Sequence, residues 1–258
     1  MRLTIIGCSG SFAGPESPAS CYLIQAESDG RTHRVLVDLG SGALGALQRH
    51  LDPADIDAIL LTHLHPDHCL DLTGLYVYRK YHPTHVFDHP LPVYGPAGAR
   101  ERLHAAYEGI DAGGMDGQYR FQVITDGDRL GFGPVRVTAR EVRHPVQAYG
   151  FRVEADGVVL ALTGDTDSCP ALTDLCRDAD LVLADSAFVE GRDAERGIHL
   201  TGRRAAEAGL AGGARRLMLT HIPSWNDPQV CRAQAGEVWP GEVELAEPGA
   251  SYELRIRD

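Results

Sequence analysis

Four side chains that can bind a metal ion follow one short apolar segment of the sequence. His63, His65, Asp67 and His68 come directly after the run 59–61, which has the character of a buried β-strand. Neutral imidazole and carboxylate groups are the usual ligands of Zn²⁺ and of other first-row divalent ions. Their density favours a metal-binding loop at the end of a strand over a surface loop that is rich in histidine by chance.

Three more candidate ligands, His144, Asp165 and His221, each stand just after another apolar segment of strand length. Taken alone, each is as readily a capping carboxylate or a hydrogen-bonded surface histidine. Together with the first four they make seven ligands, which suits two ions roughly 3.5–4 Å apart that share one carboxylate. We predict one ion on His63, His65 and His144, a second on Asp67, His68 and His221, and Asp165 as the bridge between them.

The elements that must position these ligands are short strands with helices between them. Apolar segments predict strands at 3–6, 21–26, 34–39, 59–62, 91–94, 121–124, 135–142, 151–154, 158–163, 181–185, 216–220, 243–246 and 252–256. Apolar residues at i, i+3 and i+4 predict helices at 42–51, 97–107, 170–177, 202–211 and 228–238. The dipeptide Asp156-Gly157 is typical of a type I′ turn and predicts an antiparallel hairpin. This mixture predicts an α/β (α+β) protein in which two packed sheets carry helices outside.

Length and composition describe a globular chain with one large core. The 258 residues are 43% hydrophobic and 23% charged, and we predict a single domain over residues 1–258. The segment 81–118 is rich in Pro, Gly and His and has weaker periodicity, so we predict that it is an insertion or a lid.

Charge, hydropathy and cysteine content bear on the binding partners and the cellular compartment of the protein. The net charge of −12 repels a nucleic-acid backbone, so a long RNA or DNA partner is disfavoured. No apolar window approaches the ~18 residues of a membrane span, and the first residues lack the pattern of a signal peptide. Six scattered cysteines without a C-x-x-C pair fit a reducing compartment. We therefore expect a cytoplasmic protein with buried thiols and no membrane partner.

The H-x-H-x-D-H pattern of residues 63–68, with the downstream His, Asp and His, resembles the metallo-β-lactamase superfamily. The resemblance runs from Ile5 to about Trp225. It implies an αββα sandwich of two mixed sheets flanked by helices, with two divalent ions, Zn²⁺ or Mn²⁺, at one edge. It also implies that Asp38 supports the metal loop from outside the ligand set.

Within the superfamily, the shared Asp and third His of the second site resemble the branch of tRNase Z and related phosphodiesterases. The segments 7–11, 17–20, 45–50, 68–72 and 220–225 look closest to the atypical class II cyclic-nucleotide phosphodiesterases of bacteria. His199, in His-Leu-Thr before a helix, is similar to an additional His of the branch, and Asp185 stands where the branch has an acidic residue. The resemblance therefore adds His199, Asp185 and Asp67 as catalytic residues.

His199 is the candidate general acid or phosphate-oxygen donor, and the alternative is a structural contact with Asp67 or Asp185. For substrate binding we predict Trp225, which follows His221 closely and could stack on a purine, together with Ser11 and Ser20. Three tyrosines could line the mouth, although core positions are the more frequent outcome: Tyr22, Tyr76 and Tyr149.

The leading interpretation is hydrolysis of a 3′,5′-cyclic nucleotide, such as cyclic AMP, to a 5′-monophosphate by a hydroxide held between two metal ions. In tRNase Z a long arm that grips tRNA precedes the bridging Asp, whereas His144 and Asp165 are only 21 residues apart here. The alternatives are a tRNase Z-like RNA phosphodiesterase, a hydrolase of lactone, thioester or arylsulfate substrates, and a non-enzymatic metal-binding module.

Two further features concern assembly and a second metal group. The helices expected at 42–51 and 70–78 resemble those used for dimerisation in this branch, so we predict a homodimer. His82, His85 and His89 could bind a metal, but no buried strand flanks them, and the sequence favours a solvated loop.

Overall fold

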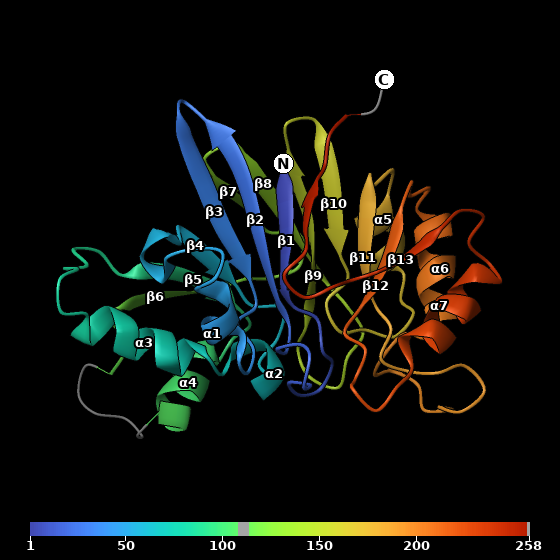
Figure 1. Cartoon of the computed structure of the whole chain (residues 1–258), viewed down its shortest axis with the longest axis horizontal. Helices are drawn as coiled ribbons and strands as arrows, with labels where there is room; N and C mark the ends of the chain where they lie inside the picture. The colour runs from blue at the N-terminus through green and yellow to red at the C-terminus, as the bar shows by residue number, and fades with distance from the viewer. Residues whose placement is uncertain (108–113, 257–258) are drawn as a thin grey trace.

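The structure, a computed structural model, describes residues 1–107 and 114–256, and in them two mixed seven-stranded sheets pack face to face (Figure 1). The first sheet has the order β14 (Ser251–Glu253), β1 (Arg2–Gly7), β2 (Cys21–Ser28), β3 (Arg31–Val37), β4 (Ala58–Leu60), β5 (Leu91–Gly95) and β6 (Tyr119–Val123). The second has the order β13 (Val243–Leu245), β12 (Leu217–Thr220), β11 (Leu181–Asp185), β10 (Val158–Leu162), β9 (Tyr149–Ala155), β8 (Val135–Glu141) and β7 (Arg129–Phe132).

Helices cover the outer faces of both sheets (Figure 1). Those beside the first sheet are α1 (Ala43–Leu47), α3 (Leu72–Tyr81) and α4 (Ala99–Tyr107), with a 3₁₀ turn at Pro53–Asp55 and the short α2 (Pro66–Cys69) at the lower edge. Those beside the second sheet are α5 (Ala171–Cys176), α6 (Gly202–Ala211) and α7 (Pro228–Gly236). The predicted sandwich of two sheets with helices outside is confirmed.

Alternation of side chains along the strands explains why both faces of each sheet are buried. In β3, Val35 and Val37 face the space between the sheets, whereas Leu36 packs with the helices of the first sheet. In β11, Leu183 faces the space between the sheets, whereas Val182 packs with the helices of the second sheet. Three apolar layers therefore hold the four structural layers together.

The hairpin predicted from Asp156-Gly157 is present. Strands β9 and β10 pair antiparallel, and the two turn residues have φ values of 56° and 72°. Both values are those of a type I′ turn, which favours Asp and Gly at these positions. The hairpin fills the whole interval between the chain segments that carry His144 and Asp165.

The strand predicted at 91–94 is confirmed within the segment 81–118, and the insertion or lid in that segment stays a prediction. Leu91–Gly95 forms β5, which pairs in parallel with both β4 and β6, so this stretch belongs to the first sheet. Alternating apolar residues Leu91 and Val93 are buried there. Residues 108–113 of the segment lie outside the described residues.

The other differences are at weak elements. Strand β7 was not predicted, because it is a half-exposed edge strand with Gly131 at its centre and a thin apolar pattern. The helix expected at 42–51 is shorter, and the last strand ends at Glu253 rather than at residue 256. The homodimer stays a prediction. Among the described residues, no helix is both long enough and apolar enough to cross a membrane.

The parallel parts of the two sheets bring several strand ends to one edge. Strands β3 to β6 run parallel in the first sheet, and β10 to β13 run parallel in the second. Chain segments that leave β3, β4, β10, β11 and β12 therefore meet at this edge, close to α2. All the predicted metal ligands and catalytic residues lie in these segments or in the one that leaves β8.

Candidate metal centre

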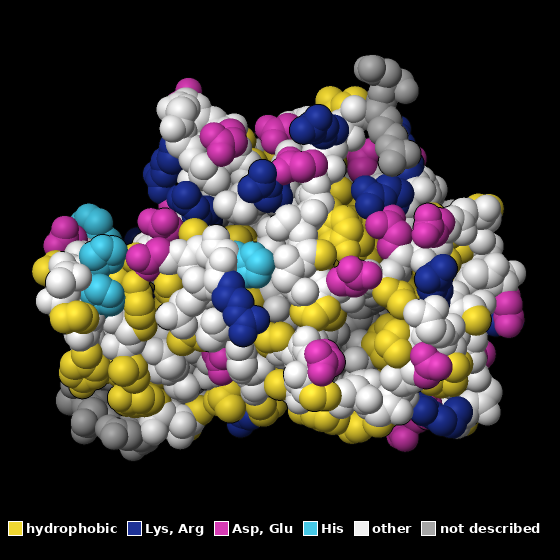
Figure 2. All heavy atoms as spheres, viewed as in Figure 1, with side chains coloured by type: hydrophobic (Ala, Val, Ile, Leu, Met, Phe, Trp, Pro, Cys, Tyr) yellow, Lys and Arg dark blue, Asp and Glu magenta, His cyan; other side chains and the backbone are white. Residues whose placement is uncertain are grey.

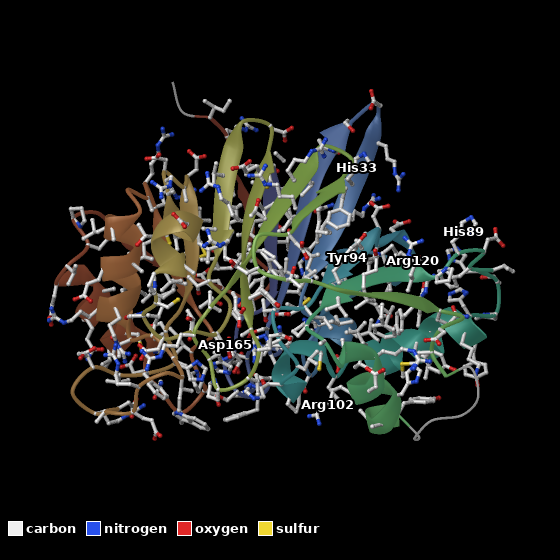
Figure 3. All side chains as sticks on the ribbon, turned by 180° about the vertical axis from the view of Figure 1, so that it is seen from behind. His33, His89, Tyr94, Arg102, Arg120 and Asp165 are labelled. Atoms are coloured by element: carbon white, nitrogen blue, oxygen red, sulfur yellow. The ribbon has the colours of Figure 1, made fainter. Side chains whose placement is uncertain are left out.

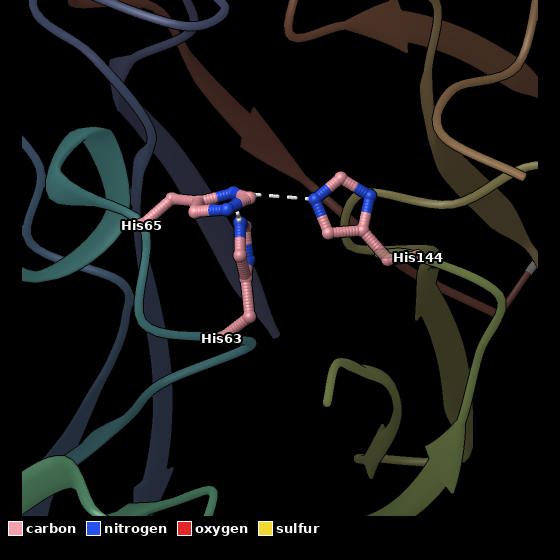
Figure 4. A group of neighbouring side chains, drawn as sticks. All are labelled: His63, His65 and His144. Atoms are coloured by element: carbon pink, nitrogen blue, oxygen red, sulfur yellow. Dashed lines mark hydrogen bonds between the residues drawn. The ribbon is translucent and has the colours of Figure 1, made fainter. Parts of the chain in front are cut away.

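Three predicted ligands form one compact group. The Nε2 atom of His63 lies 2.9 Å from Nδ1 of His65, and that Nδ1 atom lies 3.2 Å from Nε2 of His144 (Figure 4). The first two rings come from the loop after β4, and the third comes from the loop after β8. Residues 79 positions apart in the sequence thus turn nitrogen atoms toward one point.

The other four predicted ligands form a second group next to the first. Asp67, His68, Asp165 and His221 are all buried and each places one donor atom within 4.8 Å of the others. The Oδ2 atom of Asp165 lies 3.1 Å from Nε2 of His221, 3.3 Å from Nε2 of His68 and 3.7 Å from Nε2 of His63. Asp165 therefore stands between the two groups, which is the position of a bridging carboxylate.

The donor atoms fit metal ligation. Four ligand atoms at about 2.0–2.1 Å from a tetrahedral ion are about 3.3 Å from one another, and the distances above scatter around that value. Nε2 of His68 and Nε2 of His221 are buried without a hydrogen-bond partner. Buried nitrogens of this kind are costly unless something binds them. The two groups are therefore suited to divalent cations.

The rings of His68 and His144 are also held from their other side. Asp38 Oδ2 accepts a hydrogen bond from Nδ1 of His68 at 2.7 Å, and its two oxygens accept bonds from the backbone N and hydroxyl of Thr62 at 2.8 Å. Nδ1 of His144 donates to the carbonyl of Ile198 at 2.9 Å. Such partners fix the tautomer and the direction of a metal-binding imidazole. Asp38 lies where the family resemblance predicted it.

Unusual backbone lets the loops approach one another. Asp38 and His221 have φ values of 58° and 56°, in the left-handed region that costs a residue with a side chain about 1–3 kcal/mol. A Cβ atom at Gly40 would lie 1.9 Å from the carbonyl oxygen of Asp67, and one at Gly10 would lie 2.3 Å from that of His221. The two glycines therefore permit contacts with the metal loops that larger residues would block.

The electrostatics of the cluster suit ligation. Burial would raise the pKa of the Asp165 carboxyl, but the nearby charges of His221 and His68 outweigh it and hold that pKa well below its usual range. Burial, reinforced by the charge of His68, lowers the pKa of His63 well below its usual range. An ionised carboxylate and a neutral imidazole are the forms that bind metal.

His199 stands beside the two groups with a carboxylate behind it. Its Nδ1 atom lies 2.9 Å from Oδ2 of Asp185, and its ring stacks on that of His221 with centroids 5.4 Å apart. Burial would lower the pKa of His199, but the charge and hydrogen bond of Asp185 raise it to about 9. Asp185 also accepts backbone hydrogen bonds from Thr166 and Ala187, so it is itself fixed. His199 can therefore present a protonated Nε2 to a substrate.

Comparison with known proteins decides the family. The model of the beta-lactamase superfamily domain matches residues 33–222, which include all seven predicted ligands. The chain belongs to the metallo-β-lactamase superfamily. This membership agrees with the double sheet and with the His and Asp groups at its edge, and it makes the chain a metal-dependent hydrolase that uses divalent ions.

Several relatives span nearly the whole chain. An uncharacterized protein of Mycobacterium leprae is 38% identical over 99% of this chain and 89% of its own length. The crystal structure of the metallo-β-lactamase fold protein YhfI from Bacillus subtilis has a TM-score of 0.85 and 26% identity, covering 98% of this chain and 99% of that chain. Ribonuclease Z of Myxococcus xanthus is 29% identical over 100% of this chain and 99% of its own length.

The three residues predicted to bind substrate in this superfamily member differ in exposure: two are exposed and one is buried. Trp225 is exposed, and its ring lies 4.8 Å from that of the exposed Phe12. Ser11, next to Phe12, is exposed, and its contact with substrate stays a prediction. Ser20 is 1% exposed and its hydroxyl lies 3.0 Å from Nδ1 of His221, so it positions a metal ligand and is not available to substrate.

Sequence reasoning missed Phe12. It lies in the loop between β1 and β2, which meets the loop after β12 through a bridge between Ser9 and Ile222. Only the contact between two loops far apart in the sequence marks it as a partner of Trp225. The three tyrosines considered for the mouth are core residues, each less than 9% exposed: Tyr22, Tyr76 and Tyr149.

The second histidine group does not join the metal centre. Within residues 1–107 and 114–256, His82, His85 and His89 belong to none of the groups that could hold an ion. Seen from behind, His89 lies at the outer edge of the molecule, far from Asp165 (Figure 3). His85 and His89 are exposed in this segment.

Metal binding to this hydrolase should raise its resistance to heat. At a free ion concentration 100 times the dissociation constant, binding stabilises the native state by about 2.7 kcal/mol. For a domain of this size that corresponds to roughly 5–10 °C. We expect this rise in Tm when Zn²⁺ or Mn²⁺ is added to protein treated with chelator and then dialysed, measured by differential scanning fluorimetry. An unchanged Tm at saturating metal would contradict the assignment.

Proposed function

We propose that the chain is a dinuclear phosphodiesterase that hydrolyses 3′,5′-cyclic nucleotides, such as cyclic AMP, to 5′-monophosphates. The observation that carries the proposal is the shared position of Asp165 between two ligand groups, with the hydrogen-bonded pair of His199 and Asp185 beside them. The donor atoms of this pair also lie within 4.8 Å of His221, and we propose that the pair serves the substrate and not a metal ion. Two ligand groups suit an anionic substrate with two oxygens to be clamped. A proton donor that is not a ligand suits a leaving group that needs a proton.

The seven ligands would hold two divalent ions, Zn²⁺ or Mn²⁺, which when bound neutralise phosphate charge and supply an activated water. The remaining chemistry belongs to the chain. Nε2 of His199 donates its proton to O3′ of the ribose as the bond from phosphorus to that oxygen breaks. Asp185 keeps the ring in place through Nδ1 and stabilises its positive charge. The product is then the 5′-monophosphate.

The pair of Phe12 and Trp225 supports a nucleotide as the substrate. Both rings are exposed, and Trp225 is only four residues beyond His221. An exposed aromatic pair next to a phosphate site offers a stacking surface that accepts any base. We therefore propose that these two side chains bind the base while the metal centre binds the phosphate.

Two observations favour a small substrate over a long RNA. The interval between His144 and Asp165 contains only the hairpin of β9 and β10, so no arm for gripping tRNA is inserted there. On the described part of the face in Figure 2, Lys and Arg side chains are mixed with Asp and Glu and form no continuous basic stripe. The net charge of −12 adds a general repulsion. The RNA phosphodiesterase remains the second candidate, because ribonuclease Z is among the relatives.

The deciding experiment is incubation of the purified protein and Mn²⁺ or Zn²⁺ with a panel of substrates, followed by chromatography. The panel contains 3′,5′-cyclic AMP, 2′,3′-cyclic AMP, a precursor tRNA, a lactone, a thioester and an arylsulfate. We expect release of 5′-AMP from the first. Cleavage of precursor tRNA without release of AMP would support the second candidate, and turnover of only a non-phosphate substrate would reject both.

Replacing Trp225 with alanine should weaken nucleotide binding. Stacking on an aromatic side chain contributes about 1–3 kcal/mol per base, so we expect KM for cyclic AMP to rise about tenfold with little change in kcat. Phe12→Ala should act in the same direction. Tyr81→Ala removes another exposed aromatic ring, on α3, and serves as the matched control. Equal effects of Trp225→Ala on cyclic AMP and on bis(4-nitrophenyl) phosphate, which has no base, would reject base stacking.

A further inference from the structure

A buried carboxylate outside the two ligand groups holds the segment before His199. Asp167 is 0% exposed and accepts a hydrogen bond from the Gly197 backbone N at 2.7 Å and from Nε of Arg196 at 2.8 Å, both on Oδ2. Its Oδ1 atom accepts from the backbone N of Ser168 at 2.7 Å and from the guanidinium of Arg204. Both oxygens are thus fully engaged by the chain itself.

These bonds join three of the loops that carry the centre. The backbone N of Asp167 donates to the carbonyl of Arg143 at 2.8 Å, which fixes the loop of His144 against the loop of Asp165. The bonds to Gly197 and Arg196 fix the loop of His199 to the same carboxylate. Asp167 is therefore the point at which all three loops meet.

The segment 194–198 has few other attachments. Among the described residues, its hydrogen bonds go only to Asp167 and to Nδ1 of His144, which donates to the carbonyl of Ile198. Gly197 has a φ of 85°, so the chain turns sharply just before it enters the site. A segment that is attached at only two points becomes much more mobile when one of them is removed.

Arg204 fixes the carboxylate from behind. It is 6% exposed and lies in the first turn of α6. Its backbone N donates a hydrogen bond to the hydroxyl of Thr201, the N-cap residue of that helix. The rigid helix thus reaches Asp167 through a buried guanidinium.

We propose that Asp167, backed by Arg204, is a positioning residue for His199: its carboxylate clasps the segment 196–197 and so sets where the His199 ring stands. The inference rests on the proposed role of His199 in the reaction. It adds a residue that touches neither substrate nor metal and acts only through the loop that it holds.

The test compares Asp167→Asn with a matched control, Asp180→Asn. Asp180 also accepts hydrogen bonds from one backbone N–H, that of Val159, and from one arginine, Arg215. It stands just before the first residue of β11, whereas Asp185 is the last residue of that strand, so Asp180 lies at the end of β11 away from the centre. An asparagine at either position retains one acceptor oxygen, but its NH₂ group replaces the second oxygen and faces the N–H donors that the carboxylate had bound. Arg196→Ala, which removes a largely exposed side chain, is a milder second variant that tests the clasp if Asp167→Asn does not fold.

For each variant, metal is titrated to saturation before kcat and KM are measured with cyclic AMP and with bis(4-nitrophenyl) phosphate. We expect kcat of Asp167→Asn to fall about 10–100-fold at saturating metal, and KM to change less. The kcat of Arg196→Ala should lie between the values of the wild type and of Asp167→Asn. Asp180→Asn should keep the wild-type kcat. In the double variant with His199→Ala, the Asp167→Asn change should cost almost nothing further, because its effect passes through His199.

Hydrogen exchange gives a readout that needs no substrate. Peptides that contain residues 196–199 should exchange faster in Asp167→Asn and at the wild-type rate in Asp180→Asn. The inference is overturned if exchange there is unchanged, if added metal restores full kcat, or if the double variant shows additive losses. If the wild type does not cleave cyclic AMP, the proposed function fails while the exchange comparison still decides whether Asp167 holds the loop.

Discussion

Asp165→Asn is expected to reduce hydrolysis by about 10³-fold or more. Loss of a group that only supports a metal ligand costs 10–100-fold, and Asp165 is placed to serve both of the proposed ions. Its Oδ2 atom lies 3.1–3.7 Å from ring nitrogens of three histidines, one of them in the first ligand group. Asparagine has one acceptor oxygen and no charge, so it can neither bridge two ions nor balance their charge.

The measurement pairs kcat with the metal content of the purified variant, determined by mass spectrometry. We expect the number of bound ions to fall together with kcat, and we expect the gain of Tm on metal addition to shrink. Asp180→Asn, an acid-to-amide change at a half-buried position away from the centre, should retain both metal and rate. A variant at position 165 that bound as much metal as the wild type and kept a tenth of its activity would show that the carboxylate is not shared.

The convergence of the seven candidate ligands could be predicted from the sequence because strand ends are visible in it. A buried strand appears as a short apolar run, and the residue types that follow it are the first to reach the edge of the sheet. His63, Asp165 and His221 each stand one to three positions after β4, β10 or β12. Parallel pairing through β11 places the ends of β10 and β12 at one edge, and the packing of the two sheets places the end of β4 at the same edge. Because these residues are His and Asp, the usual ligands of divalent ions, their gathering at one edge favours a metal centre over other kinds of site.

Contacts between loops could not be predicted in this way. Phe12 carries no local pattern that relates it to Trp225, because their contact depends on how two loops fold over the sheet edge. Asp167 stands two positions after a ligand and looks like a further surface acid, although four donors from three segments surround it. Burial of a polar side chain is a property of the packed structure, and a single sequence does not display it.

The same limit explains the role of Ser20. Its family-like segment indicated a place in the site, and the structure does put it there. The hydroxyl nevertheless faces Nδ1 of His221 and not the open side of the centre. The alternating run at 91–94 does predict β5, despite the Pro, Gly and His residues around it, and the structure pairs this strand with neighbours on both sides.

His199→Ala is expected to lower kcat for cyclic AMP by about 10²–10⁴-fold, the usual contribution of a positioned proton donor. The ribose O3′ is a poor leaving group unless it receives a proton as its bond to phosphorus breaks. Nδ1 of His199 is engaged by Asp185 at 2.9 Å, so Nε2 is the nitrogen left to deliver that proton. Asp185→Asn should lower kcat less, because the ring remains and only its orientation and charge suffer.

A change of leaving group separates proton donation from a structural role. The 4-nitrophenolate released from bis(4-nitrophenyl) phosphate leaves readily without a proton, so His199→Ala should slow that substrate at least tenfold less than it slows cyclic AMP. The metal content of the variant should stay at the wild-type value, because His199 is placed outside the seven ligands. Equal losses on both substrates would instead assign His199 to binding of phosphate oxygens, and loss of metal would assign it to support of the ligand groups beside it.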